Sequence, residues 1–206
     1  MSAPHRRILA LVLASFAVAP ALTAQAEQKQ PAPPATISSF RYTSVGLSVF
    51  QVDIDGVDDE AFGFGLTGAY EFAPQFYALA EIATAEADFP GGGDLELDSY
   101  ALGAGYYIPI DEATDVYGEL ALLRVEVDVP GADDDENGWS LEAGVRRWLV
   151  EKVEVDASLA WVDLDDSDIA IGLGGQYYFN DQFSVGASFE LADDTDTISL
   201  DLRYYL

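Results

Sequence analysis

The chain has 206 residues, with 37 acidic against 9 basic side chains and a formal net charge of −28 at pH 7. This balance excludes nucleic acid as a partner, because binding to phosphates requires clustered Lys and Arg. Cysteine is absent, which excludes disulfides and thiolate metal sites.

Residues 1–26 have the pattern of a secretory signal peptide. Arg6 and Arg7 precede an apolar run, and an Ala-Gln-Ala cleavage site follows it. We expect cleavage after Ala26, which leaves 7 basic residues (9 − 2) against 37 acidic ones. The alternative is a retained membrane anchor, but the apolar run is short for a membrane span.

The rest of the chain is organised as a leader followed by ten amphipathic segments. Residues 27–38 are polar and rich in proline, which predicts a flexible leader. Beyond it, apolar residues alternate with small or polar ones, and side chains on a strand point alternately to opposite faces. Each segment therefore predicts a strand with one apolar face. The segments are 39–52, 61–73, 76–89, 97–108, 115–129, 139–149, 153–163, 169–179, 183–191 and 196–206.

The connections between these segments predict a barrel with two different rims. Short turns alternate with longer acidic or Gly-rich loops such as 53–60 and 130–138, which is the arrangement of outer-membrane barrels. In the fifth segment the apolar pattern changes parity beyond Leu122, so we expect that end to leave the bilayer. Because both chain ends then lie on the short-turn side, the strand number must be even. Ten strands fit, with eight as the alternative if the third segment or one hairpin is misread.

The direction of the apolar face separates a membrane barrel from a soluble one. A soluble barrel would turn its apolar face inward. Here the other face is dominated by Gly, Ala and Ser, which suits a crowded lumen. Aromatic residues on the apolar face also cluster near the short turns, as in a membrane-interface girdle. The predicted girdle is Phe72, Phe76, Tyr106, Tyr177, Phe179, Phe183 and Tyr204. We predict an all-β, single antiparallel up-and-down transmembrane β-barrel over residues 39–206.

Strand–turn–strand units such as GQYYFNDQFSVGASFE and the final RYYL resemble the small porin-like outer-membrane β-barrel family. The transmembrane domain of OmpA and the OmpX-type barrels belong to the same group. The resemblance implies a bacterial outer-membrane location with a periplasmic leader, and contact with outer-membrane lipid and lipopolysaccharide. It also implies recognition of the last strand by the barrel-assembly machinery, although this chain ends in Leu206 where members usually have Phe. We expect a monomer.

The predicted lumen contains eight acids and two arginines. If the parity is right, the inward residues are Glu71, Glu81, Glu119, Glu142, Arg146, Glu154, Asp156, Glu190, Asp201 and Arg203. Rings of carboxylates select cations, so one hypothesis is a porin-like barrel with an acidic lumen that passes water or small cations. A lumen blocked by Arg146 paired with Glu71 or Glu119 would favour a closed barrel instead.

The second hypothesis is a closed structural or surface-interaction barrel whose acidic external loops contact divalent cations, lipopolysaccharide or outside partners. The strongest local candidate for a metal is Asp133, Asp135 and Asn137, which match the first half of an EF-hand loop. The twelfth position is Gly144, where the bidentate Glu belongs. We therefore expect no cofactor, beyond loosely bound Ca²⁺ or Mg²⁺ at the acidic loops.

Histidine chemistry is excluded from the mature chain. The only histidine, His5, is lost with the signal peptide, so no His-based general base or catalytic triad can form. We expect no enzymatic activity.

Overall fold

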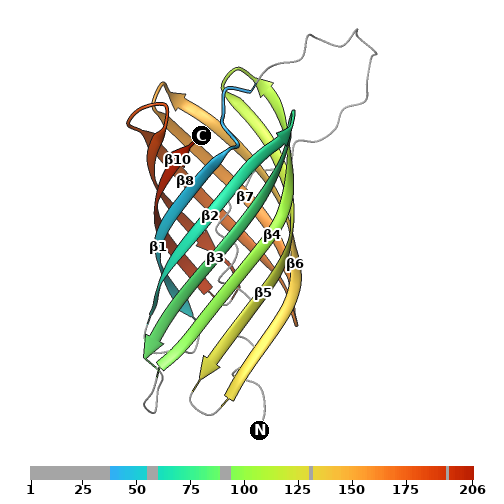
Figure 1. Cartoon of the computed structure of the whole chain (residues 1–206), viewed down its shortest axis with the longest axis vertical. Helices are drawn as coiled ribbons and strands as arrows, with labels where there is room; N and C mark the ends of the chain where they lie inside the picture. Colours follow the sequence, from blue (N-terminus) through green and yellow to red (C-terminus); the bar gives the residue numbers. More distant parts are fainter. Residues whose placement is uncertain (1–37, 55–59, 89–93, 130–131, 194) are drawn as a thin grey trace.

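A computed structural model describes residues 38–54, 60–88, 94–129, 132–193 and 195–206. Ten antiparallel strands pair with their sequence neighbours, and β1 pairs with β10 to close the barrel (Figure 1). This confirms the ten-stranded up-and-down barrel and removes the eight-stranded alternative. The predicted signal peptide and residues 27–37 of the leader lie outside the described residues.

The strands follow the predicted alternation but several are longer than expected. They are β1 (Ser44–Ile54), β2 (Ala61–Ala73), β3 (Phe76–Asp88), β4 (Asp94–Asp111), β5 (Thr114–Val129), β6 (Ala132–Val150), β7 (Val153–Asp163), β8 (Ser167–Tyr178), β9 (Phe183–Leu191) and β10 (Thr195–Tyr205). A bilayer requires about 9–11 residues per strand, whereas β4, β5 and β6 have 18, 16 and 19. These three strands therefore extend well beyond the membrane.

The short turns lie at the barrel end that also holds the C-terminus, at the top of Figure 1. In outer-membrane barrels this is the periplasmic end. The turn from β2 to β3 shows how the sequence forms a short turn. Ala73 pairs with Phe76, and Gln75 between them has φ 71°. Pro74 presets the backbone of the first turn position, and a positive φ at the second is the geometry of a type II turn.

The membrane-spanning part carries its apolar residues on the outside. Leu66, Leu102 and Leu122 are 47, 64 and 68% exposed. Every other strand also has large apolar side chains that are exposed on the outer face. Because a closed barrel satisfies all its backbone polar groups within the sheet, this surface can face lipid directly. No described helix is long and apolar enough to cross a membrane.

Where β4 and β5 leave the membrane, the polar and apolar faces are reversed: the outward face becomes polar and the inward face becomes apolar. On β4, Tyr100 and Leu102 face outward within the apolar belt, whereas Glu96 faces outward and Leu97 is fully buried inside. On β5 the outward apolar positions end at Leu122, and the strand keeps its alternation beyond that residue. The predicted parity change is therefore a change of residue type on an unbroken strand. Water surrounds this part, so charges face outward and apolar side chains fill the interior.

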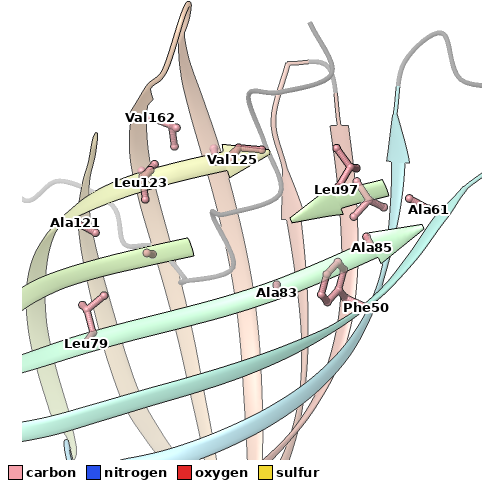
Figure 2. Close-up of a cluster of buried hydrophobic side chains, with 14 of the residues drawn as sticks. Phe50, Ala61, Leu79, Ala83, Ala85, Leu97, Ala121, Leu123, Val125 and Val162 are labelled. Atoms are coloured by element: carbon pink, nitrogen blue, oxygen red, sulfur yellow. The ribbon is translucent and has the colours of Figure 1, made fainter. Parts of the chain in front are cut away.

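Those interior side chains form an apolar core at the extracellular end of the barrel. Figure 2 shows Phe50, Leu97, Val125 and Val162 projecting inward from β1, β4, β5 and β7. The apolar core consists of Phe50, Val52, Ile54, Leu95, Leu97, Leu123, Val125, Val127 and Val162, none more than 7% exposed. The sequence prediction did not include this core, because the inward face was expected to carry small and polar residues along its whole length.

Two predicted boundaries are wrong. The first strand begins at Ser44 rather than residue 39, because the residues before it pack across the periplasmic mouth. Residues 132–138 of the predicted loop 130–138 form a strand instead, because β6 starts at Ala132 and pairs with β5 residue by residue, and residues 130–131 lie outside the described residues. Strand pairing satisfies the backbone N–H and C=O groups of these residues within the protein, whereas in a solvated loop water would satisfy them.

Candidate functional site in the barrel lumen

The structure places all ten predicted lumen residues on the inward face of the barrel. Glu81, Glu142, Glu154 and Glu190 are buried, each no more than 7% exposed. The other six are partly buried: Glu71, Glu119, Arg146, Asp156, Asp201 and Arg203. Buried charges are costly unless they are paired or hydrogen-bonded, so their partners decide what the lumen can do.

Four of the acids accept hydrogen bonds from tyrosines on the inward face. The phenol–carboxylate distances are 2.5 Å for Tyr77–Glu119, 2.8 Å for Tyr107–Glu71, 3.2 Å for Tyr117–Glu142 and 2.6 Å for Tyr178–Glu154. Sequence parity puts these tyrosines inward, but nothing in the sequence says which acid each one meets. Tyrosine, rather than arginine, therefore satisfies much of the lumen.

Arg146 pairs along the wall rather than across the lumen. Its Nε lies 2.9 Å from Oε1 of Glu154 on the adjacent strand β7. The pairing of Arg146 with Glu71 or Glu119 that would have favoured a closed barrel is not the ion pair that forms, because Glu154 lies on the strand next to Arg146. The guanidinium also lies over the Tyr42 ring, 5.1 Å from its centroid, a favourable cation–π contact.

Arg203 forms the second ion pair, with Asp201 on its own strand. Its Nε lies 3.2 Å from Oδ2 of Asp201, and Gln176 donates to the same oxygen at 2.6 Å. Glu190 contrasts with this arrangement, because its buried Oε1 has no hydrogen-bond partner among the described residues. Eight acids thus share two arginines, and several depend on neutral donors.

Residues 38–43 cross the periplasmic mouth of the lumen, and we call them the N-terminal plug. Phe40 stacks on Trp148 with ring centroids 5.3 Å apart, and Tyr42 stacks on Tyr107 at 3.9 Å. The Tyr42 hydroxyl donates to Asp115 at 3.0 Å. Burial raises the pKa of the Tyr42 phenol above its ordinary value, so it remains a neutral donor. The plug was predicted as the start of a strand, and the inward aromatic residues at the mouth hold it there instead.

Two lumen tyrosines lie flat across glycines of the next strand. Tyr77 is paired with Gly105 and Tyr117 with Gly144. A Cβ on either glycine would lie well under 3.0 Å from the tyrosine Cζ. These glycines are therefore required because the rings occupy the space where a side chain would be.

The two adjacent arginines of β6 give a matched test of the lumen ion pair. We expect Arg146→Met to destabilise the barrel by about 3–5 kcal/mol, because Glu154, 1% exposed, would lose its counter-charge. Arg147 is 53% exposed and contacts Asp111 at 3.6 Å, so Arg147→Met should cost less than about 1 kcal/mol. Urea unfolding in detergent micelles measures both. Equal costs would contradict the assigned role of Arg146.

The predicted aromatic girdle lies on the outer face beside the short turns. Phe76 packs against Tyr106 at 4.7 Å and Phe183 against Tyr204 at 4.9 Å between ring centroids. Phe72, Phe76, Tyr106, Tyr177, Phe179 and Phe183 are 38–57% exposed, and Tyr204 is partly buried. This position matches the interfacial belt of a membrane barrel.

The predicted metal candidate lies in the extracellular part of β6. Asp135 contacts Arg124 at 3.2 Å, Asn137 pairs with Arg124 in the ladder, and the side chain of Asp133 lies outside the described residues. Within the described ranges, no group of three His, Cys, Asp or Glu side chains could hold a metal ion. A ladder of extended strands also cannot wrap an ion as an EF-hand loop does.

The barrel and its apolar belt define a class, the small outer-membrane β-barrels. A family model described as "Outer membrane protein beta-barrel domain" matches residues 8–168. The chain belongs to this family, and the protein resides in the bacterial outer membrane. No curated protein matches its sequence.

Solved porins have the same kind of fold. The NanC porin matches with a TM-score of 0.51 and 8% identity, over 78% of this chain and 100% of that one. The KdgM porin in complex with disordered oligogalacturonate gives 0.48 and 10%, over 79% and 99%. The attachment invasion locus protein Ail of Yersinia pestis gives 0.34 and 21%, over 79% and 94%. The likeness to NanC concerns the fold alone, and the chain is a porin-like barrel.

Proposed function

We propose that this porin-like barrel is closed in its resting state and acts at the cell surface through its extracellular part. The observation that carries the proposal is the exchange of polarity on β4 and β5, where apolar residues fill the interior and acids cover the outside. An apolar interior blocks ions, because they would lose their hydration without gaining ligands.

Two further features support a closed lumen. The N-terminal plug stacks on the aromatic residues of the periplasmic mouth. Between the plug and the apolar core, two lumen cavities measure only about 50 Å³ each. Each has room for roughly three or four water molecules, so neither is by itself a wide aqueous passage.

The outer face of the extracellular part carries two rows of acids, which we call the acidic ledge. The first row pairs Glu86 with Glu96 and Glu96 with Asp128; the second pairs Asp98 with Glu126 and Glu126 with Asp135. Arg124 contacts Glu126 at 2.7 Å and Asp135 at 3.2 Å and so compensates part of the second row. The remaining like charges directly opposite one another on neighbouring strands destabilise the sheet. Divalent cations would relieve this repulsion and would also bridge the ledge to the anionic lipopolysaccharide around it.

The test is the response of thermal stability to calcium in vesicles that contain lipopolysaccharide. We expect millimolar Ca²⁺ to raise the unfolding midpoint of the wild type by a few degrees. The variant Glu96→Gln/Glu126→Gln/Asp128→Asn should lose this response. A control that removes the same charge at the periplasmic turns, Glu112→Gln/Glu151→Gln/Asp181→Asn, should keep it. An unchanged calcium response in the ledge variant would contradict the proposal.

The second candidate function is passage of water or small cations through the acidic lumen. The observation in its favour is the excess of carboxylates between the plug and the apolar core. Passage would require both closures to open. Planar-bilayer recording with the pure wild type separates the candidates: we expect no current, and a steady cation-biased current would favour passage over the closed barrel.

Other properties follow from the same proposal. We propose a monomer without enzymatic activity, because the outward apolar face suits lipid and the only histidine precedes the expected cleavage site. We also propose that the assembly machinery recognises β10, whose pairing with β1 closes the barrel.

A further inference from the structure

The middle of the lumen contains a small cavity that no side chain fills, and we call it the central chamber. It measures about 50 Å³ and is bounded by residues of β1, β2, β3 and β7–β10. Phe50 of the apolar core lines it, so its extracellular side is covered by apolar side chains. The volume is enough for an ion with two or three water molecules.

The chamber lining carries more negative than positive charge. Glu81, Asp156 and Asp201 contribute carboxylates, and Arg203 is the single arginine or lysine among the lining residues. Arg203 lies 3.2 Å from Asp201, whose Oδ2 also accepts the bond from Gln176. One arginine therefore faces three acids, and its Nε is already engaged with one of them.

Glu81 gives an independent indication that something occupies the chamber. The residue is 7% exposed, and its carboxylate interacts with the charges of Arg203 and Glu119 rather than through hydrogen bonds with the described residues. A buried carboxylate without a donor is unstable as an anion. The exposure that remains is toward the chamber, because Glu81 lines it.

We infer that the central chamber binds one small monovalent cation, sodium or potassium, together with a few water molecules. Hard cations prefer oxygen ligands, and the Ser188 and Ser199 hydroxyls, 2.5 Å apart, add neutral oxygens to the carboxylates. No group of three His, Cys, Asp or Glu side chains of the described residues could hold a metal ion by itself, so serine hydroxyls and water molecules must complete the coordination. Arg203 supplies one positive charge among the three lining carboxylates, and the cation compensates the negative charge that remains.

The test compares thermal unfolding in sodium chloride and in choline chloride at equal ionic strength, in zwitterionic micelles without lipopolysaccharide. Choline is too large for the chamber, so we expect sodium to raise the unfolding midpoint by a few degrees over choline. Glu81→Gln should abolish this difference. Glu86→Gln, on the outward face of the same strand, should preserve it.

Two results would overturn the inference: equal midpoints of the wild type in both salts, or a sodium effect that persists in Glu81→Gln. If Glu81→Gln does not fold, Ser199→Ala serves as the second variant, with a reduced sodium effect expected. Crystals of the wild type grown with rubidium should show an anomalous peak in the chamber, and an empty chamber would contradict the inference. The control Glu86→Gln changes a residue of the acidic ledge and should leave the sodium effect intact, whereas Glu81→Gln leaves the ledge intact, so this test and that of the proposed function can fail separately.

Discussion

Replacing Leu97 by aspartate is expected to destabilise the barrel by about 4 kcal/mol or more. Leu97 is 0% exposed within the apolar core, and an unpaired carboxylate there would have neither water nor a counter-charge. Urea unfolding followed by tryptophan fluorescence measures the loss. This result is the strongest check of the exchanged polarity, because a water-filled lumen would tolerate an inward acid at this position.

The neighbouring residue provides the control for Leu97→Asp. Glu96 faces outward on the same strand, opposite Glu86 and Asp128. Glu96→Leu removes like-charge contacts, so the free energy of unfolding should change by less than about 1 kcal/mol. If Glu96→Leu cost as much as Leu97→Asp, the assignment of inside and outside would be wrong in this part of the barrel.

Replacing Gly144 by alanine is expected to cost about 2–3 kcal/mol of the free energy of unfolding, in the upper part of the usual range of about 1–3 kcal/mol for overpacking a buried site. Its Cβ would overlap the ring of Tyr117 at Cζ, and that ring is 6% exposed and hydrogen-bonded to Glu142. Alanine normally improves a strand position by up to about 1 kcal/mol over glycine, so the clash outweighs that gain. Urea unfolding in micelles measures whether Gly144→Ala lowers or raises the free energy of unfolding.

Two comparisons separate the clash from a general effect of glycine. No atom lies within 4 Å of the position that a Cβ on Gly68 would occupy, so Gly68→Ala should be neutral or slightly stabilising. In the double variant Gly144→Ala/Tyr117→Ala the cost should be less than the sum of the single costs. Additive costs would show that the ring is not what excludes a side chain at residue 144.

The sequence predicted most of the fold because period-two alternation is a local signal. It placed ten strands and the closed antiparallel barrel, since both follow from which way the side chains point. It could not place the partners of the charged lumen residues. Arg146 meets Glu154 because strands β6 and β7 are in a particular register, and register depends on pairing between segments rather than on either segment alone.

The missed features have the same cause. Phe40 and Tyr42 fit the alternation of a first strand, yet they belong to a plug because Trp148 and Tyr107 from distant strands offer stacking surfaces. Asp133–Gly138 has the composition of a loop, but pairing with β5 makes it a strand. In both places a long-range contact overrides a correct local pattern.

By itself, the sequence determined that the chain forms a membrane barrel with an apolar outer belt, because alternation fixes which side chains share a face. Only the tertiary structure revealed the contacts on which the proposed closure of the lumen rests. Closure depends on apolar side chains from β1, β4, β5 and β7 meeting in the interior, and on six residues packing across the mouth. Those contacts join segments far apart in the chain, and no local pattern encodes the distance between them.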